Sequence, residues 1–98
     1  MEITINNIPH TIKWTLRAFF IFEQITDKMF KMETVTDEYI FVYCLLLANN
    51  PDTQLTFDDF INACDEDVEA LNTIRNFIAK EMQKRTLFIT DDESKKKN

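Results

Sequence analysis

The chain contains no glycine in 98 residues, so it lacks the residue that most readily forms turns with positive φ. Such turns must then come from asparagine and aspartate, which also tolerate positive φ. The same absence excludes the glycine-rich phosphate loops of nucleotide-binding enzymes and the nucleophile elbow of serine hydrolases. The residues that stand where turns are expected are Asn6, Asn7, Asp27, Asn49 and Asn50.

Charge and apolar content limit the compartment and the partners. Seventeen acidic against eleven basic residues give a net charge of −6, which argues against a nucleic-acid partner. The longest apolar run, residues 39–48, is about half the ~20 residues that span a bilayer. The first residues do not resemble a signal peptide, and Cys44 and Cys64 suit a reducing compartment. We therefore expect a cytoplasmic protein without a membrane segment, and Cys44 as a core residue.

Hydrophobic periodicity predicts an α+β fold that is mostly α. Period-two alternation on either side of Asn6 and Asn7 predicts an N-terminal hairpin with strands near 2–6 and 10–14. Helical spacing predicts a bundle of about four helices, on which the hairpin packs. The chain is expected to form one domain over 1–89, followed by a flexible charged tail at 90–98. The predicted helices cover about 15–26, 37–48, 57–63 and a last stretch from Asp65 or Asp67 to about Arg85.

Capping residues mark two of these helix starts. Thr36 is expected to cap the second helix and Thr56 the third, with Asp59 in the capping-box position. The second helix is apolar nearly all round, which predicts that it lies at the centre of the bundle.

The sequence offers no catalytic, metal or cofactor site. His10 has no second ligand at metal-binding spacing and is predicted to lie on the surface of the hairpin. The segment 50–60 resembles half of a calcium loop but lacks its first carboxylate and its glycine. No nucleophile has a base at workable spacing. We therefore expect a non-enzymatic protein.

Two features indicate a protein-binding surface. The first predicted helix carries aromatic residues around more than half of its circumference, so some are expected to be exposed unless the hairpin and second helix cover both faces. Residues 52–69 contain seven acids and no base, which suits either helix-dipole matching or recruitment of a basic partner. The candidate partner-binding residues are Phe19, Phe20, Phe22, Tyr39, Tyr43, Asp58 and Asp59, with Trp14 shared between core and surface.

The order of segments adds a family resemblance that covers Ile3 to Phe88. Its segments are, in chain order, ITIN, TIKWT, RAFFIFEQITDK, TDEYIFVYCLLLANNPD and LTFDDFINACDED. This arrangement resembles small tail assembly chaperones of long-tailed bacteriophages and prophages, many of which carry glycine where this chain has Asn7 and Asp27.

The resemblance implies a chaperone in the bacterial host cytoplasm that takes part in virion assembly. Such chaperones bind the long helical tape-measure protein before the tail tube polymerises around it, which makes the tape-measure protein, and also the tail tube protein, the expected partners. Self-association of the chain stays open. The alternative is a small acidic inhibitor that mimics nucleic acid through residues 52–69 and binds a basic DNA-handling protein.

Overall fold

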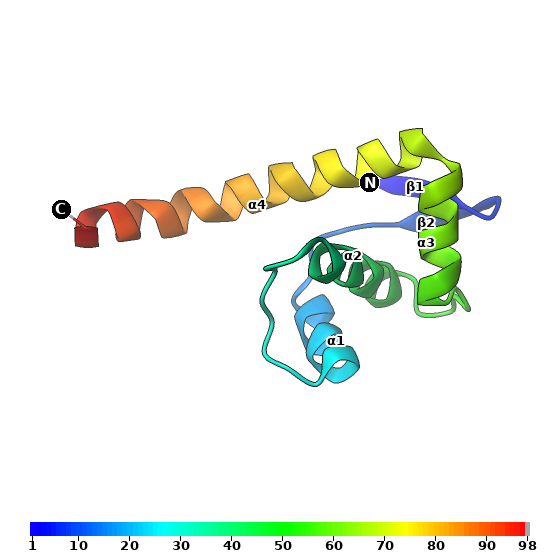
Figure 1. The fold of residues 1–98 in the computed structure, drawn as a ribbon, viewed down its shortest axis with the longest axis horizontal. Helices are drawn as coiled ribbons and strands as arrows, with labels where there is room; N and C mark the ends of the chain where they lie inside the picture. The colour runs from blue at the N-terminus through cyan, green and yellow to red at the C-terminus, as the bar shows by residue number, and fades with distance from the viewer. Residues whose placement is uncertain (98) are drawn as a thin grey trace.

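The chain folds into a two-stranded hairpin followed by four helices (Figure 1). The computed structural model describes the backbone of residues 1–97 and the side chains of residues 1–85. The predicted fold class, α+β and mostly α, is confirmed. The elements are β1 (Glu2–Ile5), β2 (Ile8–Thr11), α1 (Leu16–Thr26), α2 (Val35–Asn49), α3 (Phe57–Glu66) and α4 (Val68–Lys97).

The hairpin turns through Asn6 and Asn7, whose φ angles are 54° and 65°. A two-residue loop with positive φ at both positions is a type I′ turn, whose twist matches that of the flanking strands. Asparagine thus takes the place of glycine here, as the sequence predicts. The short loop sets Ile5 opposite Ile8, so β2 begins earlier than the predicted second strand.

His10 is buried, and the prediction that it lies on the surface is wrong. Only 4% of its surface is exposed. It pairs with Ile3, on the face of the hairpin that packs on the core. Its Nδ1 donates to the carbonyl oxygen of Ile8 at 2.9 Å, and its Nε2 lies 3.1 Å from the Thr53 hydroxyl. The loop before α3 therefore covers the ring and supplies its second polar partner.

Two local devices fix the link between α1 and α2. Asp27 ends α1 with a φ of 56°, and its N–H donates to the carbonyl oxygen of Glu23 at 2.8 Å. Thr34, rather than the predicted Thr36, caps α2. Its hydroxyl accepts from the N–H of Asp37 at 3.1 Å, and the Asp37 carboxylate accepts from the N–H of Thr34 at 3.2 Å. This reciprocal pair requires a cap three residues before the carboxylate, a spacing that Thr36 does not have.

The starts of α3 and α4 follow the predicted capping chemistry. The Thr56 hydroxyl accepts from the N–H of Asp59 at 3.0 Å, and the Asp59 carboxylate accepts from the N–H of Thr56 at 3.3 Å. The predicted capping box is therefore confirmed. Asp67 rather than Asp65 caps α4, because its carboxylate accepts from the N–H of Ala70 at 3.1 Å.

Helix α4 continues to Lys97, beyond the end predicted near Arg85. No proline or glycine interrupts residues 86–97, and the lysine and glutamate residues there favour a helix. Figure 1 shows the C-terminal half of α4 extending past the other elements. Flexibility of the predicted tail at 90–98 stays a prediction, because its side chains and all of Asn98 lie outside the described residues.

Helix α2 occupies the centre of the core, as its apolar surface predicts. Its residues Phe41, Cys44 and Leu45 have no exposed surface. The other elements pack around it and bury side chains of their own, of which each isoleucine or phenylalanine contributes about 1.5–3 kcal/mol when fully buried. These are Ile3, Ile5 and Ile12 from the hairpin region, Ala18 and Phe22 from α1, Phe60 and Cys64 from α3, and Ile74 and Ile78 from α4.

Candidate functional site

The predicted partner-binding aromatics of α1 divide between the core and the surface. Phe22 has 0% of its surface exposed, and Phe19 is half-buried. Both belong to one cluster of rings whose centroids lie 4.6–6.5 Å apart, which holds α1 against α2. Phe22 therefore cannot contact a partner in this conformation. The cluster consists of Trp14, Phe19, Phe22, Phe30 and Phe41.

Phe20 is the member of the predicted set that α1 presents to solvent. It is 54% exposed, and Leu16, one turn earlier, is also exposed. At about 100° per residue, Leu16 and Phe20 lie on the side of α1 opposite Ala18 and Phe22. We call Leu16 and Phe20 the outer stripe. The expectation that some aromatics of this helix are exposed is therefore confirmed for Phe20.

Tyr39 and Tyr43 lie where α2 meets α3. The Tyr43 hydroxyl donates to the carbonyl oxygen of Leu55 at 2.7 Å, and its ring lies 5.6 Å from that of Phe57. Tyr39 lies 6.5 Å from Phe60, measured between ring centroids. Burial raises the pKa of both phenols, so they stay protonated at neutral pH. These contacts give both tyrosines a structural role in holding α3 on α2.

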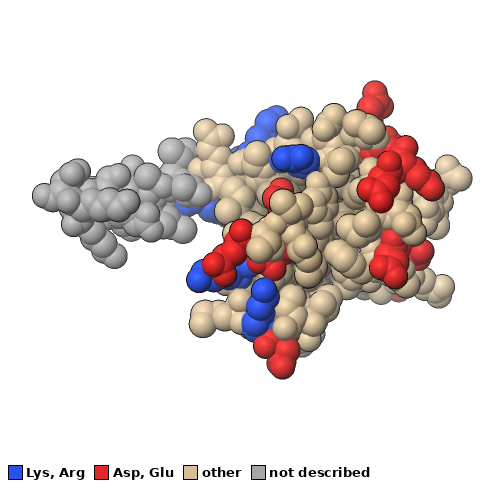
Figure 2. All heavy atoms as spheres, in the orientation of Figure 1, with Lys and Arg blue, Asp and Glu red and all other residues tan. Residues whose placement is uncertain are grey.

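Asp58 and Asp59 are exposed at the start of α3, where Asp59 also caps the helix. Figure 2 shows acidic side chains gathered at the end of the molecule formed by α3 and the start of α4. Dipole matching at the starts of α3 and α4 accounts for Asp58, Asp59, Asp67 and Glu69, but not for Asp52, Asp65 and Glu66. The exposed members of this acidic end are Asp52, Asp58, Asp59, Asp65, Glu66, Asp67 and Glu69.

A groove between the start of α2 and the middle of α4 is a candidate site that the sequence did not indicate. Its volume is about 440 Å³. Val35 on one wall is 70% exposed and Met82 on the other is 37% exposed, so both offer apolar surface to the groove. We call it the methionine groove, and its apolar lining consists of Met32, Val35, Ile78, Ala79 and Met82.

Charged contacts stabilise the segment on each side of the methionine groove. On the α2 side, the Asp37 carboxylate accepts from the N–H of Glu33 at 3.1 Å and from the Lys28 ammonium at 3.2 Å. The Glu33 N–H and Lys28 together hold the pKa of Asp37 below its ordinary value against the effect of burial. On the α4 side, burial raises the pKa of Glu81, but Lys84 and Arg85 more than offset it and the net shift is downward. These contacts stabilise each side separately, and none of them crosses the groove.

The hydrophobic pattern of the sequence indicated only some of the residues that line this groove. Met82 belongs to the predicted apolar stripe of the last helix, but it lies at the edge of the core rather than within it. Met32 and Val35 fall at the end of an irregular link, where no periodicity distinguishes buried from exposed positions.

The described side chains offer no group of histidine, cysteine and carboxylate residues that could hold a metal ion. Burial raises the pKa of the Cys44 thiol to about 12 and that of Cys64 to about 11. Both thiols are therefore protonated at neutral pH and are poor nucleophiles.

Comparison with known protein families, curated proteins and solved structures found no match for this chain. Within the described part of the chain, no helix combines the length and the apolar character needed to cross a membrane.

Proposed function

We propose that this protein is a non-enzymatic tail assembly chaperone of a long-tailed bacteriophage or prophage. In this proposal it holds apolar helical segments of the tape-measure protein in the host cytoplasm until the tail tube assembles. The observation that carries the proposal is the methionine groove, an exposed groove with apolar side chains on both walls, between two helices.

The groove suits an amphipathic helix. Such helices bind by laying an apolar face into a hydrophobic groove, with anchor residues on successive turns. Methionine side chains are flexible and polarizable, so Met32 and Met82 can adapt to different anchors along a long repetitive partner. The outer stripe of Leu16 and Phe20 offers a second apolar contact, and the net charge of −6 favours solubility of the complex.

The groove also has polar groups that can orient a partner. Glu33 and Glu38 lie on one wall and Arg75 on the other. A helix with an apolar stripe flanked by lysine or arginine on one side therefore matches the groove in both polarity and charge.

Co-expression tests the proposal. The chain is produced together with the tape-measure protein encoded in the same phage genome, and the soluble fraction of that partner is measured. The groove variant is Val35→Asp with Met82→Glu. The matched control is Val68→Asp with Met29→Glu, because Val68 is also an exposed first helical residue and Met29 is an exposed methionine outside the groove.

We expect the wild type and the control to keep the tape-measure protein soluble, and the groove variant to lose most of this effect. A wild-type chain that leaves the partner insoluble overturns the chaperone role. A groove variant that solubilises as well as the control overturns the assignment to the methionine groove. Circular dichroism of each variant establishes that it is folded.

The acidic end favours a second candidate function, that of a small acidic inhibitor that binds a basic DNA-handling protein. Electrostatic binding of this kind falls steeply with salt. The test variant is Asp58→Asn, Asp59→Asn, Glu66→Gln and Glu69→Gln, which keeps a capping side chain at Asp59. If the inhibitor role holds, salt weakens binding of the wild type to the basic protein, and the variant loses this binding. If the wild type and the variant bind the basic protein equally, the acidic end is not the contact surface.

A further inference from the structure

The hairpin has two outer edges, and the outer edge of β2 is blocked. Asn50 Oδ1 accepts from the N–H of Thr11 at 2.9 Å, and Asn50 Nδ2 donates to the carbonyl oxygen of Thr11 at 2.8 Å. Further along the same edge stands Pro9, which has no N–H to offer. Both are devices by which proteins prevent a sheet edge from pairing with another chain.

The outer edge of β1 is open. Met1 and Ile12 exchange both backbone hydrogen bonds, at 2.8 and 3.1 Å. In an antiparallel sheet, opposite residues alternate between hydrogen-bonded and non-hydrogen-bonded pairs. Glu2 and Thr4 belong to non-hydrogen-bonded pairs, so their N–H and carbonyl groups point away from β2. No group within residues 1–85 hydrogen-bonds to them. This edge therefore presents a free set of strand-pairing groups.

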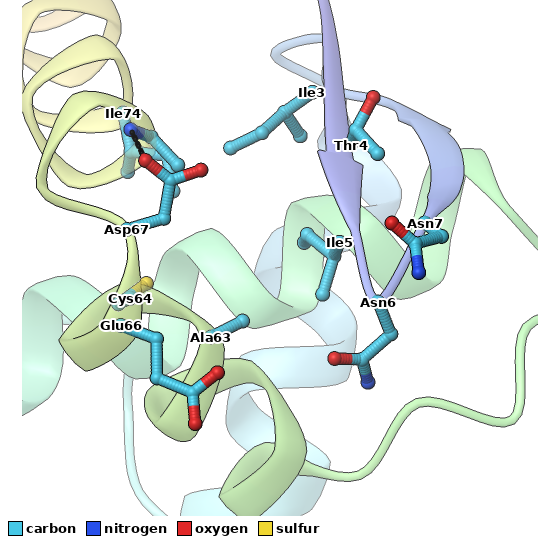
Figure 3. Close-up of a pocket in the computed structure, with 11 residues that line it drawn as sticks. Ile3, Thr4, Ile5, Asn6, Asn7, Ala63, Cys64, Glu66, Asp67 and Ile74 are labelled. Carbon is cyan, nitrogen blue, oxygen red and sulfur yellow. Dashed lines mark hydrogen bonds between the residues drawn. The ribbon is translucent and has the colours of Figure 1, made fainter.

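A cavity of about 460 Å³ borders this open edge. β1 lies between β2 and the junction of α3 with α4, and Figure 3 shows the side chains of Ile3 and Ile5 on the cavity side while Thr4 is directed away. The cavity therefore lies on the face of β1 that carries Ile3 and Ile5, next to the open edge. Opposite the edge, Cys64 and Ile74 complete an apolar floor.

The rim of the cavity is acidic. Glu66 and Asp67 line it at the junction of α3 and α4, and the Asp67 carboxylate also caps α4. Residues 57–71, which carry this rim, contain no lysine or arginine, although the Met1 ammonium lies one residue from Glu2. A ligand at this edge therefore meets a rim of net negative charge, which attracts basic side chains.

We propose that the β1 edge binds an extended basic segment of another polypeptide, which adds to the hairpin as a third strand. Its backbone pairs with Glu2 and Thr4, and those of its side chains that alternate toward the cavity are lysine or arginine and reach Glu66 and Asp67. Strand addition of this kind takes affinity from main-chain hydrogen bonds and specificity from side-chain pockets. The site is separate from the methionine groove and does not depend on the proposed chaperone role.

Charge disfavours the other occupants of this edge. A second copy of the chain would bring its own Glu2, Glu66 and Asp67 against the same acids, and like charges facing each other weaken association. Nucleic acid is repelled for the same reason.

Titration with short peptides tests the proposal. The probe is the acetylated and amidated heptapeptide Lys-Val-Lys-Val-Lys-Val-Lys. One control has the same sequence N-methylated at every residue, which removes the backbone donors and keeps the charge. The other replaces lysine with glutamate. Binding is followed by hydrogen exchange and chemical shift of the backbone amides of Glu2 and Thr4.

We expect the lysine peptide alone to bind and to slow exchange of the Thr4 amide at least tenfold. Thr4→Pro removes the outward N–H and should weaken binding about tenfold, the usual effect of losing one hydrogen bond. Because this variant could fail to fold, Glu66→Gln with Asp67→Asn provides a second test. It keeps an amide capable of capping α4 and should weaken binding and reduce its salt dependence.

Three results would overturn the proposal. The first is absence of binding at millimolar lysine peptide. The second is binding that leaves the Glu2 and Thr4 amides unprotected or that the N-methylated peptide matches. The third is protection of these amides that rises with protein concentration without peptide, which would assign the edge to a second copy of the chain.

Discussion

The guanidinium of Arg85 lies over the ring of Trp14, 4.3 Å from the ring centroid. Arg85 also donates to the Glu81 carboxylate at 3.3 Å within α4, while its stacking on Trp14 connects α4 to the segment between β2 and α1. Trp14 in turn contacts Phe41 of α2 at 4.9 Å between centroids. Arg85 thus fixes the position at which α4 leaves the other elements.

Replacing Arg85 should therefore loosen α4 and alter the environment of Trp14. We expect Arg85→Ala to lower the free energy of unfolding by about 1 kcal/mol, since a partly exposed cation–π contact and ion pair are lost. Trp14 is the only tryptophan, so its emission reports the change directly in urea unfolding. Lys84→Ala is the control, because Lys84 pairs with the same Glu81 but does not stack. Equal stability of the two variants would contradict the role of the stacked contact.

The turn residue Asn7 offers a test of how the chain manages without glycine. Its φ of 65° costs a side chain with a branched Cβ about 1–2 kcal/mol but costs glycine nothing. We expect Asn7→Gly to keep or raise the melting temperature and Asn7→Val to lower it. If calorimetry gives the two variants equal melting temperatures, the type I′ turn does not constrain this position.

Phe20 and Phe22 are two residues apart on α1 and should respond oppositely to truncation. Phe22→Ala removes a fully buried ring and should lower the free energy of unfolding by about 3–5 kcal/mol. Phe20→Ala removes an exposed ring and should change it by less than about 0.5 kcal/mol. Denaturant unfolding measures both. A large loss of stability at Phe20 would show that the outer stripe is not free for a partner.

Features set by neighbours in the chain were predictable from the sequence. The Asn6–Asn7 turn, the Thr56 capping box and the central position of α2 each depend on residues within one turn or one helix. Local chemistry decides such features before tertiary packing begins.

Features set by tertiary contacts were not predictable. His10 looks like a surface residue until Thr53, 43 positions away, contacts its ring. The methionine groove exists because α4 runs beside the start of α2 without covering Val35. Hydrophobic periodicity within one segment does not indicate this tertiary arrangement. The Thr34 cap differs from these tertiary features, because Thr34 and Asp37 have the same local capping-box spacing as Thr56 and Asp59 and could have been predicted from it.

The two cysteines should be unreactive until the protein unfolds. Burial raises the pKa of Cys44 to about 12 and that of Cys64 to about 11, so little thiolate is present at pH 8. We expect a disulfide reagent to react at least about a hundredfold more slowly with native than with denatured protein. Cys64→Ser leaves Cys44 alone and should slow the native reaction further. Fast reaction of one thiol in the native Cys64→Ser variant would show that Cys44 is accessible.

Asp37 should make stability depend on pH in the acid range. Its folded-state pKa lies below the ordinary value because the Glu33 N–H, and then Lys28, favour the charged carboxylate. A lowered pKa contributes stability that is fully present above the unfolded-state pKa and is lost as pH falls through the folded-state pKa. The contribution should therefore be complete at neutral pH and decline below about pH 4.

The comparison that isolates this contribution is Asp37→Asn against the wild type from pH 7 to pH 2. Asparagine cannot carry the charge that pairs with Lys28, so the variant should be less stable at pH 7. The two unfolding free energies should converge as the wild-type carboxyl becomes protonated. Asp52→Asn, at an exposed aspartate without a hydrogen bond among the described residues, should show no such convergence. A gap between the wild type and Asp37→Asn that stays constant over the whole range would mean that Asp37 acts through shape rather than charge.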